Sequence, residues 1–410
     1  MISWPMPSLP AVTGQGQPLQ LHDTSTGRPR LVAQGPSARM YVCGITPYDA
    51  THLGHAATYV TFDLVGRALR DSGVDVRYAQ NVTDVDDPLF ERAERDGINW
   101  VDLADREVAL FREDMTALAV IPPDAWVGVR EAMEVIAIKV AELVAAGVTY
   151  AVPVPDGPGE DLYLDLATVP SFGSVSHWSR EEMLSVFADR GGDPDREGKR
   201  SPLDPLLWRA ERPGEPAWAF AGLAPGRPGW HVECTAIAAD DLGLPFDVQG
   251  GGTDLIFPHH EMSSAQADGD FARLYVHQGM VAYEGEKMSK SRGNLVFVSR
   301  LRAQGVDPMA IRLVLLAHHY REDWEYTPDA LAFAQQRLAT WRAALSVNEA
   351  PAAEATVEAM REALADDLRA PAALAAVDDW AQASLAGGGG DPGAPGVLAR
   401  ALDALLGVRL

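Results

Sequence analysis

Residues 39–55 read RMYVCGITPYDATHLGH, and this stretch decides the fold. The apolar run at 39–44 predicts a short buried strand that ends in a turn. Val60, Leu64 and Leu69 then predict a helix over about 56–71, and the pattern at 74–80 predicts a second strand. Strand, turn, helix and strand in this order make a βαβ unit, which predicts an α/β fold with a parallel, doubly wound sheet.

The rest of the chain extends this sheet and adds two further regions. Helical periodicity covers about 100–118 and 131–146, strands resume at 245–249 and 274–281, and 152–201 follow no regular pattern. We therefore predict four segments: the first half of a nucleotide-binding α/β domain at 1–120, an insertion at 121–200, the second half of the α/β domain at 201–305, and a helical C-terminal domain at 306–410.

Composition narrows the class of protein. The 410 residues are 47% hydrophobic, enough for a full core, and no apolar run reaches 18 residues, so we expect no contact with a membrane. The first residues lack the features of a secretion signal, and we expect a cytoplasmic protein. The net charge of −24 opposes binding to a polyanion, although a local basic patch could still bind one, and we expect no nucleic-acid partner. Separately from the charge, we expect small-molecule substrates and a monomer.

The first group of residues with chemical potential is His52-Leu53-Gly54-His55. Two imidazoles three residues apart lie on one side of a helix's first turn, where unpaired backbone N–H groups already favour an anion. Gly54 leaves room for a nucleotide to lie against the backbone. The alternative is that the two histidines only cap the helix or pack in its core.

The second group is Glu286-Lys287-Met288-Ser289-Lys290-Ser291-Arg292-Gly293-Asn294. It holds Lys287 and Lys290, two of only four lysines in the chain, and two hydroxyl groups. Such a segment suits a loop that closes over a triphosphate. A solvated basic turn is the alternative.

The third group consists of Cys43, Cys234 and His259, which are far apart in the sequence. Two thiolates and one imidazole form a three-ligand zinc site with an open fourth position, the arrangement of a zinc that binds substrate. Sulfur ligands of this kind would favour the thiol of cysteine over the hydroxyl of serine. Each cysteine could instead be a small buried apolar residue.

The first two groups resemble the H-I-G-H and K-M-S-K-S motifs of class I aminoacyl-tRNA synthetases. Residues 41–49, 81–87, 226–234 and 250–261 resemble the cysteinyl-tRNA synthetases in particular, and the likeness spans about 20–325. The resemblance implies a class I synthetase-like fold, ATP as substrate with Mg²⁺, and one Zn²⁺ per chain on Cys43, Cys234 and His259. It also implies that the catalytic residues acting on the phosphates are His52, His55, Lys287 and Lys290.

By the same resemblance, an aminoacyl-adenylate would contact residues from several separate segments. They are Cys43, Gly44, Ile45, Thr46, Thr58, Asn81, Val82, Thr83, Trp230, Gly252, Thr253, Asp254 and Val281. Purely structural roles remain open for some of them: Trp230 could pack in the core, Asp254 could cap a helix, and the glycines could form only a tight turn.

Several positions depart from the synthetase pattern. Ser263 stands where those enzymes have a further glutamate ligand, Gln249 replaces a histidine, and Ala57 replaces an arginine. Residues 351–410 contain four arginines, no lysine and nine acidic residues, which does not suit an anticodon-binding module.

With these departures, the sequence resembles the cysteine ligases of mycothiol biosynthesis. Those enzymes join cysteine to the amine of glucosaminyl-inositol in an ATP-dependent, AMP-producing reaction. The segment Asp189-Arg190-Gly191-Gly192-Asp193-Pro194 resembles a Glu-Arg-Gly-Gly-Asp-Pro segment of that family. Two alternatives stay open: a cysteinyl-tRNA synthetase with a reduced anticodon module, and a catalytically inactive relative that senses cysteine or zinc.

Overall fold

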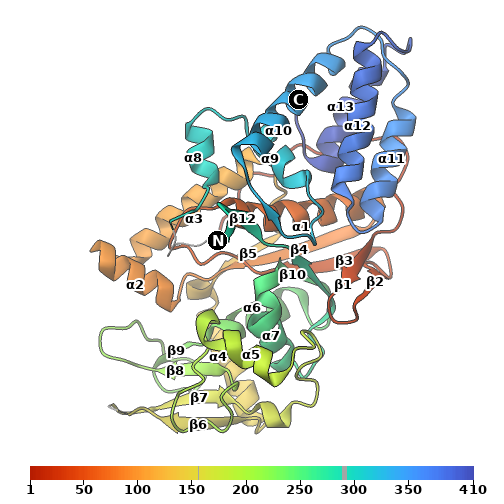
Figure 1. Ribbon diagram of the computed structural model, residues 1–410. Coiled ribbons are helices and arrows are strands. Elements are labelled where there is room, and N and C mark those ends of the chain that lie inside the picture. Colours follow the sequence, from red (N-terminus) through yellow and green to blue (C-terminus); the bar gives the residue numbers. More distant parts are fainter. Residues whose placement is uncertain (156, 289–292) are drawn as a thin grey trace.

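A five-stranded parallel sheet forms the centre of the molecule in a computed structural model that describes residues 1–155, 157–288 and 293–410 (Figure 1). Its strand order is β11-β10-β3-β4-β5, and every neighbouring pair is parallel. The strands are β3 (Ser37–Val42), β4 (Asp75–Val82), β5 (Ala125–Gly128), β10 (Phe246–Gly252) and β11 (Ala272–Gln278). The chain runs outward from β3 in both directions, so the order reverses between β3 and β10.

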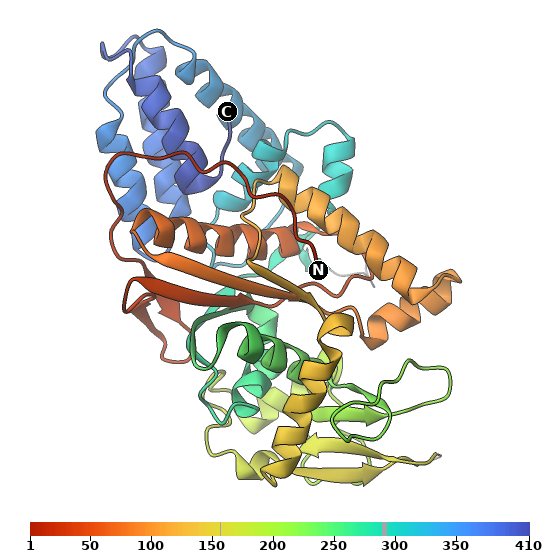
Figure 2. The same cartoon turned by 180° about the vertical axis from the view of Figure 1, so that it is seen from behind.

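Helices cover both faces of this sheet and bury two separate cores. One core joins α1 to the C-terminal helices, and the other joins α4 and α6 to the insertion. Figure 2 shows these layers from behind. The helices of the α/β part are α1 (Leu53–Asp71), α2 (Asp87–Asp96), α3 (Trp100–Ala117), α4 (Val129–Ala145), α6 (Trp230–Leu242), α7 (Glu261–Ala265) and α8 (Val298–Ala303).

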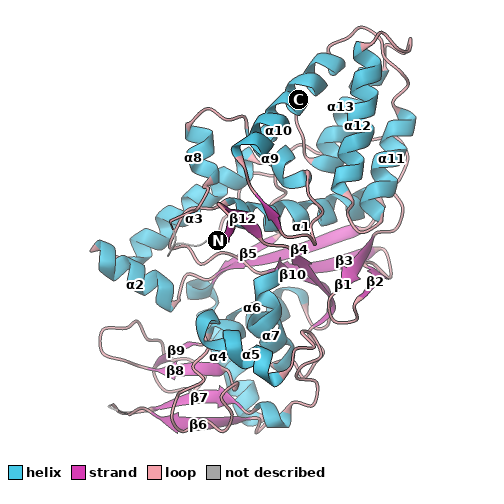
Figure 3. Ribbon diagram, in the orientation of Figure 1, coloured by secondary structure: helices cyan, strands magenta, loops and turns pink. Residues whose placement is uncertain are grey.

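A second, antiparallel sheet lies beyond α4 at the far end from the C-terminal helices (Figure 3). Its order is β6-β7-β8-β9, and helix α5 (Arg180–Phe187) belongs to the same region. The strands are β6 (Thr149–Pro153), β7 (Glu160–Leu164), β8 (Leu206–Ala210) and β9 (Gly226–Pro228). The chain returns from β9 directly into α6, so the insertion sheet lies beside the central one.

The C-terminal region is a group of helices packed on α1. They are α9 (Pro308–Leu316), α10 (Pro328–Leu345), α11 (Glu354–Ala365), α12 (Ala370–Leu385) and α13 (Ala394–Leu406). Two small sheets complete the structure: a hairpin of β1 (Gln20–Asp23) and β2 (Arg28–Leu31), and β12 (Val281–Tyr283) between β13 (Glu286–Lys287) and β14 (Trp324–Glu325). Within the described residues, no helix is long and apolar enough to cross a membrane.

The parallel sheet, its crossover helix α1 and the helical C-terminal region confirm the predicted fold class. The antiparallel sheet was not predicted, because its strands are short and separated by long Pro- and Gly-rich loops. The predicted boundary at residue 200 stays a proposal, and the sheet of β6–β9 extends across that position.

A buried ion network joins helix α1 to the C-terminal region. Asp63 of α1 accepts from the Arg67 Nε atom at 2.7 Å and from the guanidinium of Arg312 on α9, and it also accepts from the Ile121 amide at 2.8 Å. Arg312 donates onward to the carbonyl of Leu406 at 2.6 Å. All three charged side chains are fully buried, so the helix that carries His52 and His55 is held from its far side.

Replacing Asp63 with asparagine is expected to lower the free energy of unfolding by about 3–5 kcal/mol, because two buried guanidinium groups lose their counter-charge. Burial alone would raise the pKa of Asp63, but Arg67 and Arg312 hold it below its ordinary value. The stabilisation is therefore present above the carboxyl's ordinary pKa and is lost as pH falls further. Urea unfolding at several pH values measures it, and Asp366→Asn, in an exposed pair with Arg369, should change stability by less than about 1 kcal/mol.

Candidate active site

A cavity of about 940 Å³ opens at the carboxyl ends of β3 and β10, where the strand order reverses. Ligands of doubly wound sheets bind at this position, because the loops diverge there and leave a crevice. Cys43 follows β3, Gly251 and Gly252 end β10, and Gln278 ends β11, and all four line the cavity. Its floor is therefore built from the central strands themselves.

The loop after β3 lies directly against β4. A side chain at Gly44 would place its Cβ atom 1.6 Å from the carbonyl oxygen of Asn81, so only glycine fits there. The Gly44 amide donates to Oδ1 of Asn81 at 2.8 Å, and the Thr83 amide donates to the Ile45 carbonyl at 2.9 Å. Asn81 and Thr83 thus hold the loop from behind, while Cys43, Gly44, Ile45 and Thr46 face the cavity.

Both histidines of the first motif line the cavity at the start of α1. His52 is the N-cap residue, and its Nδ1 atom accepts from the Gly54 amide at 3.1 Å. The rings of His52 and His55 stack with their centroids 3.8 Å apart. The two imidazoles therefore present one common surface at the positive end of the helix dipole, which favours bound phosphate.

The second motif reaches the same cavity from the other side. Residue 287 pairs with Ala282 of β12 through its backbone, and the buried Met288 lines the cavity. Beyond the motif, the carbonyl of Val296 accepts from the Leu53 amide at 2.9 Å. Both ends of the motif are thereby anchored beside the first one. The side chain of Lys287 and the whole of Lys290 lie outside the described residues.

Cys43, Cys234 and His259 converge beside the cavity, which Cys43 itself lines. Their ligand atoms lie within 4.8 Å of one another, and all three side chains are buried. Within the part of the chain that the structure describes, the Nε2 atom of His259 has no hydrogen-bond partner. Its Nδ1 atom lies 3.0 Å from Nδ1 of His231, which fixes the ring. Burial lowers the pKa of His259, so its imidazole is neutral, as a metal ligand must be.

Two of the departures from the synthetase pattern lie beside this cluster. Gln249 donates from Nε2 to the Cys43 Sγ atom at 3.2 Å, and His260 Nε2 lies 3.3 Å from the same sulfur. Ser263 is buried on α7, and its hydroxyl has no hydrogen-bond partner among the described residues. Gln249 is therefore a neighbour of the thiolate, which the sequence pattern did not predict.

The remaining predicted residues divide into two groups. Thr58, Trp230, Gly252, Asp254 and Val281 line the cavity, and the ring of Trp230 stacks on His259 at 4.3 Å. Val82 is fully buried in β4, and Thr253 begins a short 3-10 helix beside the cavity wall. Neither Val82 nor Thr253 is among the lining residues described, so any contact they make with a ligand stays a prediction.

The insertion supplies one wall through residues 189–193. Arg190 donates to the carbonyls of Asp254 and Phe257 at 2.9 and 2.5 Å, which ties this segment to the loop before His259. Asp193 accepts from Lys199 at 2.7 Å. The first carboxylate, Asp189, is exposed at the edge of the cavity. The segment therefore lines the same cavity as the two motifs, although it is distant from both of them in sequence.

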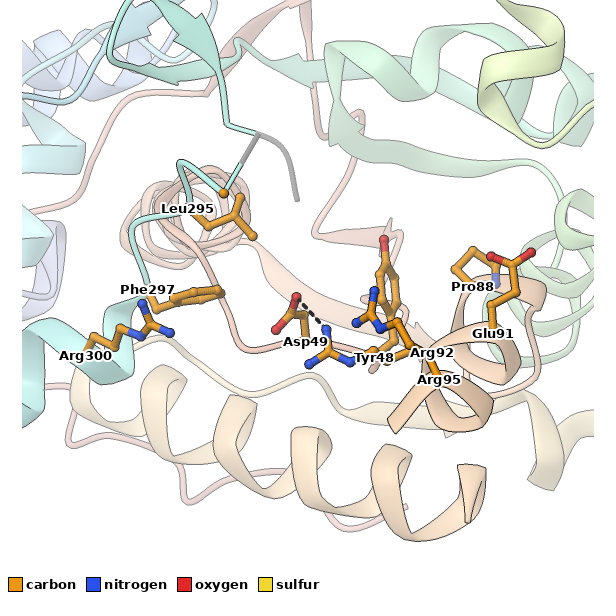
Figure 4. A pocket seen from close by; sticks show the side chains of 10 residues that line it. Tyr48, Asp49, Pro88, Glu91, Arg92, Arg95, Leu295, Phe297 and Arg300 are labelled. Carbon is orange, nitrogen blue, oxygen red and sulfur yellow. Dashed lines mark ion pairs between the residues drawn. The ribbon is translucent and has the colours of Figure 1, made fainter. Parts of the chain in front are cut away.

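A second hollow of about 550 Å³ adjoins the cavity and shares four lining residues with it: Tyr48, Pro88, Glu91 and Leu295. Figure 4 shows the guanidinium of Arg92, from α2, directed at the carboxylate of Asp49. Arg300 of α8 lies on the opposite side of the hollow, and its guanidinium lies 4.7 Å from the Phe297 ring centroid. The site thus continues outward along one side of α2.

Comparison with known proteins agrees with this geometry. Residues 31–336 match the family described as tRNA synthetases class I (C) catalytic domain, and the chain belongs to that family. The fold is also that of methionyl-tRNA synthetase from Mycobacterium tuberculosis in complex with methionyl-adenylate, with a TM-score of 0.60, 16% identity and 90% of each chain covered. The Agrobacterium radiobacter LeuRS–tRNA–LeuAMS complex gives a TM-score of 0.63 at 12% identity, covering 91% of this chain and 84% of that one.

Several curated proteins are much more similar in sequence to this chain than these solved structures are, and they share one name. A protein of Sanguibacter keddieii is 60% identical over the full length of both chains and is named L-cysteine:1D-myo-inositol 2-amino-2-deoxy-alpha-D-glucopyranoside ligase. Relatives with the same name from Streptomyces griseus and Thermobifida fusca are 59% and 58% identical, and each alignment covers the whole of this chain and 100% and 99% of the relative.

Proposed function

We propose that the protein joins L-cysteine to the amine of glucosaminyl-inositol, through cysteinyl-AMP, with release of AMP and pyrophosphate. The observation that carries this proposal is one cavity lined by His52 and His55 of the first motif and Met288 of the second, with a Cys₂His cluster beside it. The full-length identity to ligases of that name supports the choice of substrates. The acceptor is then a small molecule, and the protein acts as a monomer without nucleic acid.

In the first step, the carboxylate of cysteine attacks the α-phosphorus of ATP and pyrophosphate leaves. His52 and His55, which line the cavity, are assigned to donate to the phosphates, and Lys287 and Lys290 are assigned to stabilise the charge that grows on them. Charge moves onto the leaving pyrophosphate in the transition state, so donors placed there raise the rate. Mg²⁺ is expected to arrive with the triphosphate, held by few protein ligands.

Cys43, Cys234 and His259 are the residues that would hold Zn²⁺. They fit it: two sulfurs and the Nε2 atom of His259, which has no hydrogen-bond partner among the described residues, lie close together and buried, and they are a donor set that zinc prefers. When bound, zinc would supply a soft position for the thiolate of cysteine, which serine cannot fill equally well. Thr46, Thr58, Trp230 and Asp254 are assigned to hold the rest of the adenylate.

AMP release by the zinc-loaded protein tests the proposal, with ATP, cysteine and either glucosaminyl-inositol or tRNA as acceptor. We expect turnover with the sugar and none with tRNA, and serine should not replace cysteine. Turnover with tRNA alone would establish a cysteinyl-tRNA synthetase instead. If cysteine and ATP supported no pyrophosphate exchange, only the hypothesis of a catalytically inactive sensor of cysteine or zinc would remain.

A further inference from the structure

In the proposed ligation, no residue has yet been assigned as the base that takes the proton from the acceptor amine. The amine of the acceptor loses a proton when it forms an amide, and a carboxylate in the cavity is the natural group to receive it. Six carboxylates line the cavity besides Asp254, which is assigned to the adenylate: Asp86, Asp87, Glu91, Asp189, Asp193 and Glu233. Their surroundings differ enough to distinguish them.

Asp86 is the lining carboxylate that contacts the adenylate loop. It follows β4 as the N-cap of α2, and its Oδ2 atom accepts from the Thr46 hydroxyl at 3.4 Å. Thr46 belongs to the loop after β3 that also supplies Cys43. Asp86 is therefore next to a segment assigned to hold the cysteinyl-adenylate.

The other carboxylates are placed for different roles. Asp87 forms an ion pair with Arg227, and Asp193 is held by Lys199 at 2.7 Å. Asp189 is exposed at the edge of the cavity. Glu233 precedes the metal ligand Cys234 on α6 and is fully buried.

Glu91 lies one turn further along α2, on the part of the cavity that continues into the adjoining hollow. It and the ion-paired Asp87 form one polar wall with Arg209 and Arg227 from β8 and β9. Both arginines share Glu215, at 2.9 and 3.2 Å. Charged groups held in this way present fixed hydrogen-bond donors and acceptors, which suit a polyhydroxylated ligand.

We propose that Asp86 is the catalytic base of amide formation, and that the aminosugar acceptor lies between the N-terminus of α2 and strands β8 and β9. The amine nitrogen attacks the carbonyl carbon of cysteinyl-AMP, and a C–N bond forms. The bond from that carbon to the phosphate oxygen breaks, and AMP leaves with the electron pair. The extra proton on nitrogen passes to the carboxylate of Asp86. This inference rests on the proposed function.

The electrostatic surroundings of Asp86 suit that task. Burial is the main cause, and the charge of Asp87 the second, that raises the pKa of Asp86 to about 7. The charge of Arg227 opposes this shift. Among the described residues, Tyr48 and Glu233 also interact with the charge of Asp86. A base with a pKa near the working pH is present in its active form and still holds a proton well. Ligation should therefore slow as pH falls below about 7, because Asp86 becomes protonated.

The variant Asp86→Asn tests the proposal, because asparagine can still cap α2 but cannot accept the proton. We expect ligation to fall by at least about 100-fold, in the range of lost general-base catalysis. Cysteine-dependent pyrophosphate exchange should stay within about threefold of wild type, and hydroxylamine should still trap the cysteinyl group. Glu94→Gln, an exposed change on the same helix, is the matched control and should leave both rates unchanged.

Three results separate the possible failures. Ligation that survives Asp86→Asn would overturn the role of Asp86. Loss of pyrophosphate exchange in a variant that melts like wild type would also overturn it, because Asp86 would then act in the first step, for example on the ammonium group of cysteine. Wild-type protein that makes cysteinyl-AMP but does not use the sugar would overturn the proposed function itself.

Discussion

Replacing Cys234 with alanine is expected to remove zinc from the protein and to lower cysteine-dependent pyrophosphate exchange by about 1000-fold or more. Metal binding of this kind contributes several kcal/mol, and each 1.4 kcal/mol is a factor of ten in rate. The side chain is buried on α6 beside Cys43 and His259. Loss of one of only two thiolates leaves a site that is too weak to retain the ion during purification.

Zinc content and exchange rate are to be measured on the same preparations. Cys234→Ser is the matched variant, because it keeps nearly the same volume and removes only the soft ligand. It should lose zinc as the alanine variant does, whereas a role in packing alone would leave the serine variant active. A full equivalent of zinc in both variants would show that the metal binds elsewhere.

Replacing His55 with alanine is expected to lower the pyrophosphate exchange rate by about 100- to 1000-fold, the usual effect of removing one donor to a developing charge. His55 lies in the first turn of α1, and its ring stacks on His52. The Michaelis constant for cysteine should change little, because the zinc cluster and the loop after β3 are untouched.

His52 needs a different substitution, since its Nδ1 atom caps α1. Asparagine preserves an acceptor for the Gly54 amide, so His52→Asn should melt like wild type and still lose about 100-fold in exchange. If His52→Asn exchanged at the wild-type rate, the histidine would be a structural cap only. A loss confined to thermal stability would lead to the same conclusion.

The part of the fold that the sequence predicted is the part with strong local periodicity. The stretch around residues 39–80 combines an apolar strand, an amphipathic helix and a second strand, and the structure contains all three as β3, α1 and β4. The antiparallel sheet of β6–β9 was missed because its short strands are separated by connecting segments of up to 41 residues, such as the one between β7 and β8 that contains α5. Pairing between such strands depends on tertiary contacts rather than local pattern.

The residues of the candidate site that belong to recognisable sequence motifs could be predicted from the sequence, and the others could not. Periodicity alone could not bring Cys43, Cys234 and His259 together, because they lie in the loop after β3, in α6 and in the segment before α7. The resemblance to a family did so. Asp86 was overlooked, although an acidic pair in the loop that follows a buried parallel strand is itself a signal of a binding crevice. The contact of Gln249 with the Cys43 sulfur needed coordinates, since it depends on the register of β10 against β3.

The most direct test of the central claim offers both acceptors to the zinc-loaded protein at once. Radiolabelled cysteine, ATP, glucosaminyl-inositol and tRNA are incubated together, and the label is then separated between the small-molecule amide and the tRNA ester. We expect the label in an amide whose mass equals cysteine plus the sugar minus water. Label on tRNA with none on the sugar would contradict the account.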